Sequence, residues 1–138
     1  MSSWDSKGPI LAFFCNWAPY KSYMDLGEAG LCLSSHIHPI KVMCAGRVDP
    51  PMLLSAFEKG AEGVVVIGCK DKECRYGPGP EQEKKLAERM KGLMHVLGLE
   101  DERFSTMAYA SHEKDRLFAE MNAFAEKIAQ IKKSPLAR

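Results

Sequence analysis

The feature that most constrains the fold is a run of β-branched residues between two glycines, Gly63-Val64-Val65-Val66-Ile67-Gly68, which leads directly into Cys69. A continuous apolar run of this length predicts a strand buried on both faces, as in the centre of a parallel sheet. Two other predicted strands end in the same way, residues 10–14 in Cys15 and residues 40–43 in Cys44. Three predicted strands therefore each end on a thiol.

These thiols are expected at one edge of the sheet. Parallel strands lie about 4.8 Å apart, so three adjacent strand ends would hold their cysteines within about 10 Å of one another. In open α/β sheets this carboxyl edge is where ligands bind. Cys74 follows Cys69 on a predicted loop and can fold back as a fourth thiol. Four converging thiols predict a metal or a cluster.

Helical patterns separate the predicted strands. Asp49 followed by Pro50 marks a helix start, and this helix is expected to run to Lys59. Further helices are predicted over residues 20–35, 81–97 and 113–131, and a fourth strand over residues 104–110. The apolar stripes of the two long helices are expected to cover the sheet. The alternation predicts an α/β fold, a flavodoxin-like open parallel sheet of about four strands in the order 2-1-3-4 with helices on both faces.

The site in this fold that often binds phosphates has a different sequence here. Cys15-Asn16-Trp17 stands where a glycine-rich nucleotide loop would follow the first strand. A nucleotide or flavin site is therefore not expected there.

Length and charge narrow the class of protein. The 138 residues suit one domain, expected over residues 9–131 between a loose lead-in (1–8) and a frayed tail (132–138). A net charge of +1 with interspersed signs argues against nucleic acid as a partner. No apolar run approaches the ~20 residues that span a bilayer, and the N-terminus lacks a signal-peptide pattern. We therefore expect a cytoplasmic protein that does not insert into membranes.

The chain contains five cysteines, which in such a compartment indicate metal binding or catalysis sooner than disulfides. Cys32 lies among apolar and small neighbours and is expected to be a buried structural thiol. The spacing of Cys69 and Cys74 is weak evidence by itself, although it is similar to the first cysteine pair of plant-type ferredoxins. The four histidines show no metal-ligand spacing and are expected at the surface.

Four stretches carry a family resemblance, in this order: Phe13-Phe14-Cys15-Asn16-Trp17, Val42-Met43-Cys44-Ala45-Gly46-Arg47-Val48-Asp49-Pro50, Ala56-Phe57-Glu58-Lys59-Gly60-Ala61-Glu62-Gly63-Val64, and Gly68-Cys69 with Cys74-Arg75-Tyr76. Together they resemble the delta subunit of methyl-viologen-reducing hydrogenase. That family comprises small iron–sulfur proteins, and related modules accompany heterodisulfide reductase complexes and similar flavin-based electron-bifurcating assemblies. The resemblance covers roughly residues 9–131.

The resemblance implies a 2Fe-2S cluster that relays electrons. The expected partners are a hydrogenase or another dehydrogenase subunit on one side and an HdrA-like subunit with FAD and iron–sulfur centres on the other. By position, the implied cluster ligands are Cys15, Cys44, Cys69 and Cys74. Arg47 is a further candidate, because it could donate hydrogen bonds to cluster sulfur or offset the cluster's negative charge. Arg47 could equally have a structural role, by forming an ion pair with Asp49 or by holding its loop in place.

One position departs from the family pattern. The family commonly has a second cysteine in the motif that here reads Cys15-Asn16-Trp17-Ala18, so Ala18 cannot be a ligand. Four thiols remain, which is the number that a 2Fe-2S centre needs. If Ala18 replaces an essential ligand, the cluster is absent or Cys32 has to move in.

Two other functions stay open beside electron transfer. The four cysteines could hold zinc in a structural or adaptor module, or hold no metal. A thiol redox enzyme ranks last, because the chain lacks a close Cys-x-x-Cys pair. No nucleophile–base pair is apparent either, so any catalysis is expected in partner subunits. We expect these subunits to dock over the cysteine edge, where Trp17, Tyr20 and Tyr76 offer aromatic contacts.

Overall fold

The computed structural model describes residues 9–15, 18–31, 33, 36–42, 48–69, 79–109 and 113–131, and of Ala18, Cys69 and residues 79–83 the backbone alone. In chain order the elements are β1 (Ile10–Cys15), α1 (Ala18–Glu28), β2 (Ile37–Val42), α2 (Pro50–Glu58), β3 (Gly63–Cys69), α3 (Gly79–Leu97), the short 3-10 helix η2 (Asp101–Arg103), β4 (Phe104–Tyr109) and α4 (Lys114–Gln130). The predicted lead-in, tail and cysteine loops lie outside the described residues.

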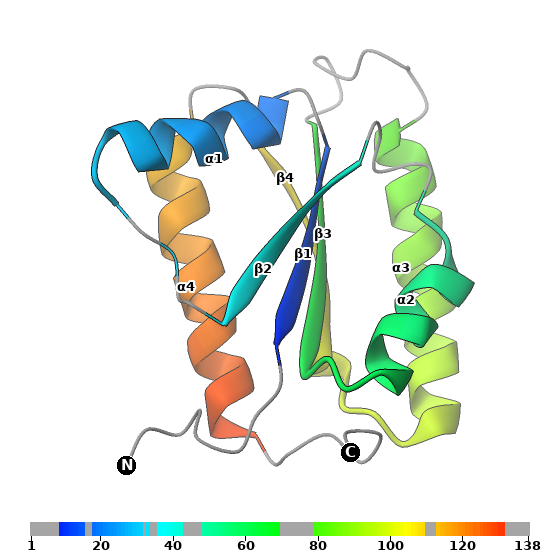
Figure 1. Ribbon diagram of the computed structural model, residues 1–138. Coiled ribbons are helices and arrows are strands. Elements are labelled where there is room, and N and C mark those ends of the chain that lie inside the picture. Colours follow the sequence, from blue (N-terminus) through cyan, green and yellow to red (C-terminus); the bar gives the residue numbers. More distant parts are fainter. Residues whose placement is uncertain are drawn as a thin grey trace.

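The four strands form one parallel sheet in the order β2-β1-β3-β4. In Figure 1, α1 and α4 lie on one face of this sheet and α2 and α3 on the other. The predicted α/β open sheet, its strand order and its helices on both faces are therefore confirmed.

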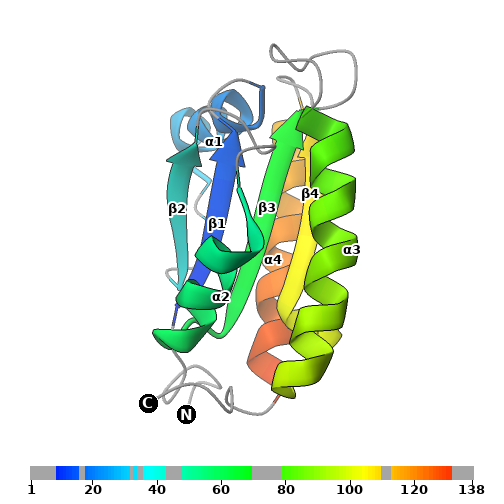
Figure 2. The same ribbon diagram turned by 90° about the vertical axis from the view of Figure 1, so that its right-hand side faces the viewer.

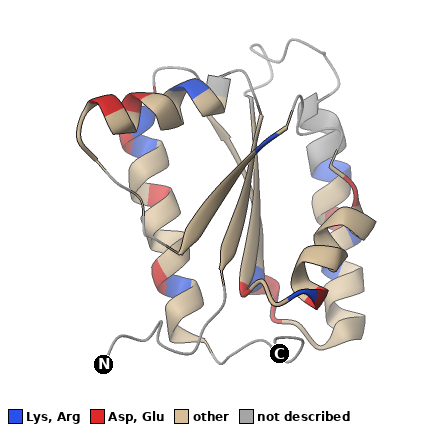
Figure 3. Cartoon of the chain, in the orientation of Figure 1, with Lys and Arg blue, Asp and Glu red and all other residues tan. Residues whose placement is uncertain are grey.

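The sheet separates two apolar cores, because successive residues of a strand point to opposite faces. The core under α1 and α4 includes Ile10, Ala12, Phe14, Leu26, Val65, Ile67, Tyr109, Leu117, Met121 and Ile128. The core under α2 and α3 includes Phe13, Leu53, Phe57, Val64, Val66, Leu86, Met90 and Met94. Since β3 contributes to both, its four apolar residues Val64 to Ile67 are fully buried, as its sequence predicts. Charged residues lie mainly on the helices (Figure 3), and within the strands Lys41 is the one Lys, Arg, Asp or Glu.

Helix α2 begins as predicted. Asp49 adopts an extended conformation, and its side chain accepts a hydrogen bond from the Met52 backbone N at 3.1 Å. Pro50 and Pro51 fill the first helical positions, where a missing N–H has no cost. Gly60, with φ of +109°, turns the chain after the helix toward β3.

Two boundaries differ from the sequence prediction. Helix α1 ends at Glu28 rather than near residue 35, because Gly30 adopts a φ of +77° and the Leu31 N–H returns to the Leu26 carbonyl at 2.9 Å. Strand β2 begins at Ile37 rather than at Ile40. Its interior contains Pro39, which lacks a backbone N–H, and this is tolerated because β2 is an edge strand.

The apolar residues of the two long helices differ in how completely they are buried. In α4, Leu117, Met121, Phe124 and Ile128 are all buried, as predicted. In α3, Leu86, Met90 and Met94 are buried, whereas Leu93 and Leu97 are 37% and 41% exposed. The prediction that the whole α3 stripe covers the sheet is therefore wrong at its end.

The chain enters and leaves the described domain at the amino edge of the sheet, opposite the edge where the strands end. The Pro9 carbonyl accepts a hydrogen bond from the Glu62 N–H at 2.8 Å, just before β3 begins. At the other end of the domain, Ile128 in the last turns of α4 lies against Gly63, the first residue of β3. Figure 2 shows the same arrangement from the side. None of the helices in the described ranges is long and apolar enough to cross a membrane.

Candidate metal centre

Two of the candidate cysteines end neighbouring strands. Cys15 is the last residue of β1 and Cys69 the last residue of β3, and these strands pair in parallel. Phe14 pairs with Ile67, so Cys15 lies one residue past this pair and Cys69 two residues past it. Adjacent strands are about 4.8 Å apart, so both backbones reach the same short stretch of the carboxyl edge.

β2, the third strand that leads to a candidate cysteine, is also adjacent to β1. Cys15 pairs directly with Val42, the last residue of β2, and Cys44 follows two positions later in the sequence. The described part of β2 ends at Val42, so the prediction that this strand leads into Cys44 falls outside the described residues. The remaining candidates, Cys44, Cys74 and Arg47, and also Cys32, lie outside the described residues.

The Cys15 thiol is buried, with 2% of the residue exposed. Next to it in sequence, Phe14 packs against Tyr23 and Tyr20, with ring centroids at 5.0 Å and 6.5 Å. The Lys41 ammonium lies 5.1 Å from the centre of the Tyr20 ring, within the range of a cation–π interaction. An aromatic cluster thus covers the carboxyl end of β1 on the α1 side.

A polar network at the end of β4 was not foreseen from the sequence. Tyr109 is fully buried and pairs in register with Cys69 on β3. Its hydroxyl donates a hydrogen bond to Glu120 Oε1 at 2.6 Å. Arg116 binds Glu120 at 3.2 Å and Glu113 at 3.3 Å, and its guanidinium carbon lies 5.3 Å from the centre of the Tyr109 ring.

The surroundings of Tyr109 favour its neutral phenol over the phenolate. Burial raises the pKa of Tyr109 well above its usual value, and the hydrogen bond to Glu120 raises it further. The sequence did carry a signal for the helix part, because Glu113, Arg116 and Glu120 have the three- and four-residue spacings of ion pairs on a helix. Nothing local indicated that Tyr109 would join them.

The candidate cysteine ligands are of the type that the expected 2Fe-2S cluster binds. Thiolates are the ligands of 2Fe-2S clusters and of tetrahedral structural zinc. Three cysteine-bearing segments follow three adjacent parallel strands, which fits a thiolate site shared between strand ends. Among the side chains that the structure describes, no three Cys, His, Asp or Glu form a possible metal site, and Cys15 is the one candidate thiol included.

Comparison with known proteins finds curated relatives of similar length. The chain is 31% identical over 126 residues to the vhc iron-sulfur subunit of the F420-non-reducing hydrogenase of Methanococcus voltae, covering 91% of this chain and 86% of the relative. It is 30% identical over 133 residues to the vhu iron-sulfur subunit of the F420-non-reducing hydrogenase of Methanopyrus kandleri, covering 96% and 99%.

A longer relative contains a similar segment. The chain is 33% identical over 122 residues to one subunit of the ferredoxin/F420H2-dependent CoB-CoM heterodisulfide reductase of Methanosarcina acetivorans, covering 88% of this chain. This match spans 15% of the length of that larger protein.

Residues 10–132 match the sequence model of one protein family, which is described as methyl-viologen-reducing hydrogenase, delta subunit. That range contains every described strand and helix. The chain therefore belongs to the family of methyl-viologen-reducing hydrogenase delta subunits.

Proposed function

We propose that this chain is the iron–sulfur electron-transfer subunit of a larger oxidoreductase complex. It would hold a 2Fe-2S cluster through Cys15, Cys44, Cys69 and Cys74, with Arg47 donating to cluster sulfur. Its electrons would pass between a hydrogenase or other dehydrogenase partner and an FAD-containing subunit of a heterodisulfide-reductase-like, electron-bifurcating complex.

The observation that carries this proposal is the meeting of cysteine-bearing strand ends. β2, β1 and β3 are consecutive in the sheet, Cys15 and Cys69 end two of them, and Cys44 follows the third. One isolated cysteine at a strand end is more often a small buried hydrophobe. Three such segments at one edge, with Cys74 five residues after Cys69 in the sequence, favour a shared metal centre.

The names and lengths of the relatives support the choice of partners. Similar sequences occur as a separate iron-sulfur subunit of a hydrogenase and also as about 15% of a large heterodisulfide reductase subunit. A domain that is separate in one assembly and part of a large subunit in another suits a position between them. This supports a relay from a hydrogenase or dehydrogenase to a heterodisulfide-reductase-like subunit.

The chain's own residues provide the surroundings that such a centre needs. When bound, the cluster supplies one-electron transfer without bond rearrangement in the protein. The aromatic cluster of Phe14, Tyr20 and Tyr23 packs beside the end of β1, on the face opposite the Cys15 side chain. Behind it, the fully buried strand β3 gives the edge a rigid base. We further propose that the partner docks over this cysteine edge, since it is the shortest way out of the fold.

Metal analysis of the full chain, purified anaerobically from its producing organism, tests the proposal. We expect brown protein with about two iron atoms and about two acid-labile sulfides per chain, and an electron paramagnetic resonance signal after reduction. Colourless protein with about one zinc per chain would instead identify a structural thiolate site. Either that result or metal-free protein with intact fold would overturn the electron-transfer function.

A further inference from the structure

The two edges of the sheet differ in how they are protected. An edge strand exposes backbone donors and acceptors that can pair with another strand, and proline or a charge along it prevents this. Edge strand β2 contains Pro39 in its interior and the exposed Lys41. Edge strand β4, Phe-Ser-Thr-Met-Ala-Tyr, contains neither a proline nor a charged residue. Within the described parts of the chain, no strand pairs with its outer side.

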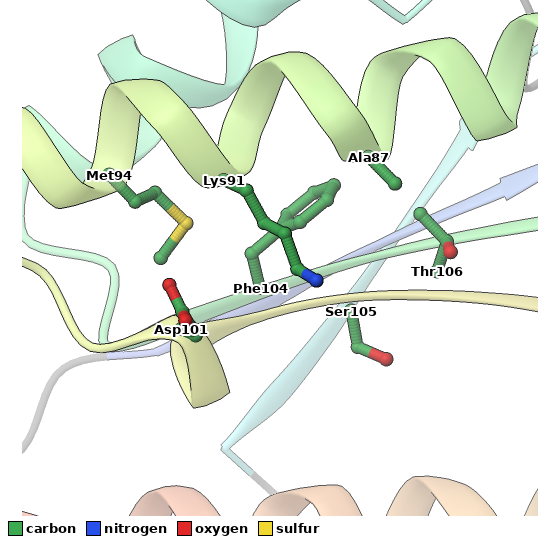
Figure 4. A pocket seen from close by; sticks show the side chains of 7 residues that line it. All are labelled: Ala87, Lys91, Met94, Asp101, Phe104, Ser105 and Thr106. Carbon is green, nitrogen blue, oxygen red and sulfur yellow. The ribbon is translucent and has the colours of Figure 1, made fainter.

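A groove runs beside this unprotected edge. It has a volume of about 200 Å³ and lies between α3 and the first half of β4 (Figure 4). Its lining is formed by Ala87, Lys91, Met94, Asp101, Phe104, Ser105 and Thr106. Met94 and Phe104 make the floor apolar, and the hydroxyl residues Ser105 and Thr106 belong to the edge strand itself. A second chain that pairs with β4 could therefore place alternate side chains in the groove.

The charge on the helix side of the groove selects among possible occupants. Lys84, Ala87 and Lys91 are spaced by three and four residues, so they share one face of α3, and the exposed Glu88 lies beside both exposed lysines. Ala87 and Lys91 line the groove. Lys91 is the charged residue that α3 contributes to this lining, and Asp101 is the other charged residue there. An extended segment with an acidic side chain near Lys91, on the side away from Asp101, complements this pattern.

We propose that the outer edge of β4 binds an extended acidic segment of a partner subunit, which adds a fifth strand to the sheet. The backbone ladder of β4 supplies affinity, and Lys91 selects an acidic side chain at an alternate position of the segment. This contact is separate from the cysteine edge. It rests on the proposed function only because it takes the chain to be one component of a larger assembly.

Hydrogen exchange tests the pairing directly. The probe is the native assembly, isolated through a tag on this chain, and the reference is the isolated full chain. We expect the outward-facing amides of Phe104–Tyr109 to exchange at least about tenfold more slowly in the assembly, while the amides of Ile37–Val42 change less. Equal exchange of the β4 amides in both samples overturns the proposal. So does a β4–β4 dimer of the isolated chain in sedimentation measurements.

Charge reversal tests the role of Lys91. We expect Lys91→Glu to lower the yield of the assembly about tenfold or more at low salt. The matched control Lys85→Glu, an exposed lysine of the same helix that does not line the groove, should leave the yield within about twofold. Equal losses in both variants would show a general charge effect and overturn the assignment.

Iron and sulfide content of the same wild-type assembly separates the two proposals. An iron-loaded assembly with unprotected β4 amides overturns the edge-strand contact alone. An assembly without iron but with protected β4 amides overturns the proposed cluster function alone.

Discussion

Arg103 and Glu62 form an ion pair at 2.9 Å in which neither side chain has any exposed surface. The Arg103 guanidinium also binds the Glu62 carbonyl at 2.9 Å, and its Nε contacts Glu100. These bonds join the residue before β3 to the residue before β4 at the amino edge of the sheet. Glu62 lies in one of the stretches that carry the family resemblance, and the structure shows that its carboxylate is part of the core.

Breaking this pair should be strongly destabilising. Arg103→Met leaves the Glu62 carboxylate buried without its cation, and we expect a loss of about 3–5 kcal/mol in the free energy of unfolding. The double variant Glu62→Gln, Arg103→Met removes both charges and should regain part of that loss. Urea unfolding midpoints measure both. The exposed Lys21–Asp25 pair supplies the control, since Lys21→Met should change stability by less than about 1 kcal/mol. A loss in Arg103→Met no larger than in this control would contradict the prediction.

Tyr109 should make stability depend on pH in the alkaline range. Its pKa is raised in the folded protein, so its contribution is complete below the unfolded pKa of about 10 and is lost as pH rises beyond it. We expect Tyr109→Phe to lose about 1 kcal/mol at pH 7 from the missing bond to Glu120. The difference from wild type should shrink above about pH 10, because only the wild type has this ionisation. Urea unfolding at several pH values measures this, and a difference that grows above about pH 10 would refute the assignment.

Gly63 lies where α4 packs closely on the start of β3. A Cβ at this position would lie 3.0 Å from Ile128 Cδ1 and 3.3 Å from Phe124 Cζ. Gly63→Ala should destabilise the protein by about 1–3 kcal/mol, and Ile128→Val should relieve part of that loss in the double variant. The control is Gly92 in α3, where a Cβ meets nothing within 4 Å. Gly92→Ala should stabilise by about 0.5–1 kcal/mol, and thermal unfolding of the four proteins provides the comparison.

The cysteine assignment predicts which thiols control the visible spectrum. Serine at Cys15, Cys44, Cys69 or Cys74 should bleach the spectrum or alter it strongly, because each change removes one thiolate ligand. Cys32→Ser is the matched control and should keep the spectrum intact. A visible spectrum identical to that of the wild type in the Cys44→Ser protein would contradict the proposed set of four cysteine ligands.

Ala18 allows a separate test of the departure from the family pattern. If the family's second cysteine is an accessory thiol, Ala18→Cys should leave the iron content unchanged. A rise from iron-free protein to about two iron atoms per chain would show instead that the natural chain has lost its cluster. Iron analysis of both proteins, purified side by side, decides between these results.

The fold was predictable because its strongest signals are local and agree with one another. The apolar run of β3 is buried on both faces, and the Asp49–Pro50 start of α2 is where the sequence places it. The errors lie at boundaries. Gly30 ends α1 early through its backbone conformation, and β2 extends across Pro39 because only its place at the sheet edge makes a proline acceptable there.

The candidate site was predictable in outline only. The position of Cys15 and Cys69 on adjacent strand ends follows from strand order. The bond between Tyr109 and Glu120 depends on how α4 crosses the sheet, which no short stretch of sequence specifies. The buried pair of Glu62 and Arg103 is similar, since two charged residues 41 positions apart look like ordinary surface residues until the fold brings them together.

The first and last described residues lie at the same edge of the sheet, which is compatible with a similar segment occurring in proteins of different size. The backbone enters at Pro9 and leaves after α4 at the amino edge, whereas Cys15 and Cys69 lie at the opposite edge. A linker attached at the amino edge leaves the cysteine edge uncovered. Fusion of such a domain to a large partner would then raise the effective concentration of one for the other while leaving the cysteine edge free for the proposed contact.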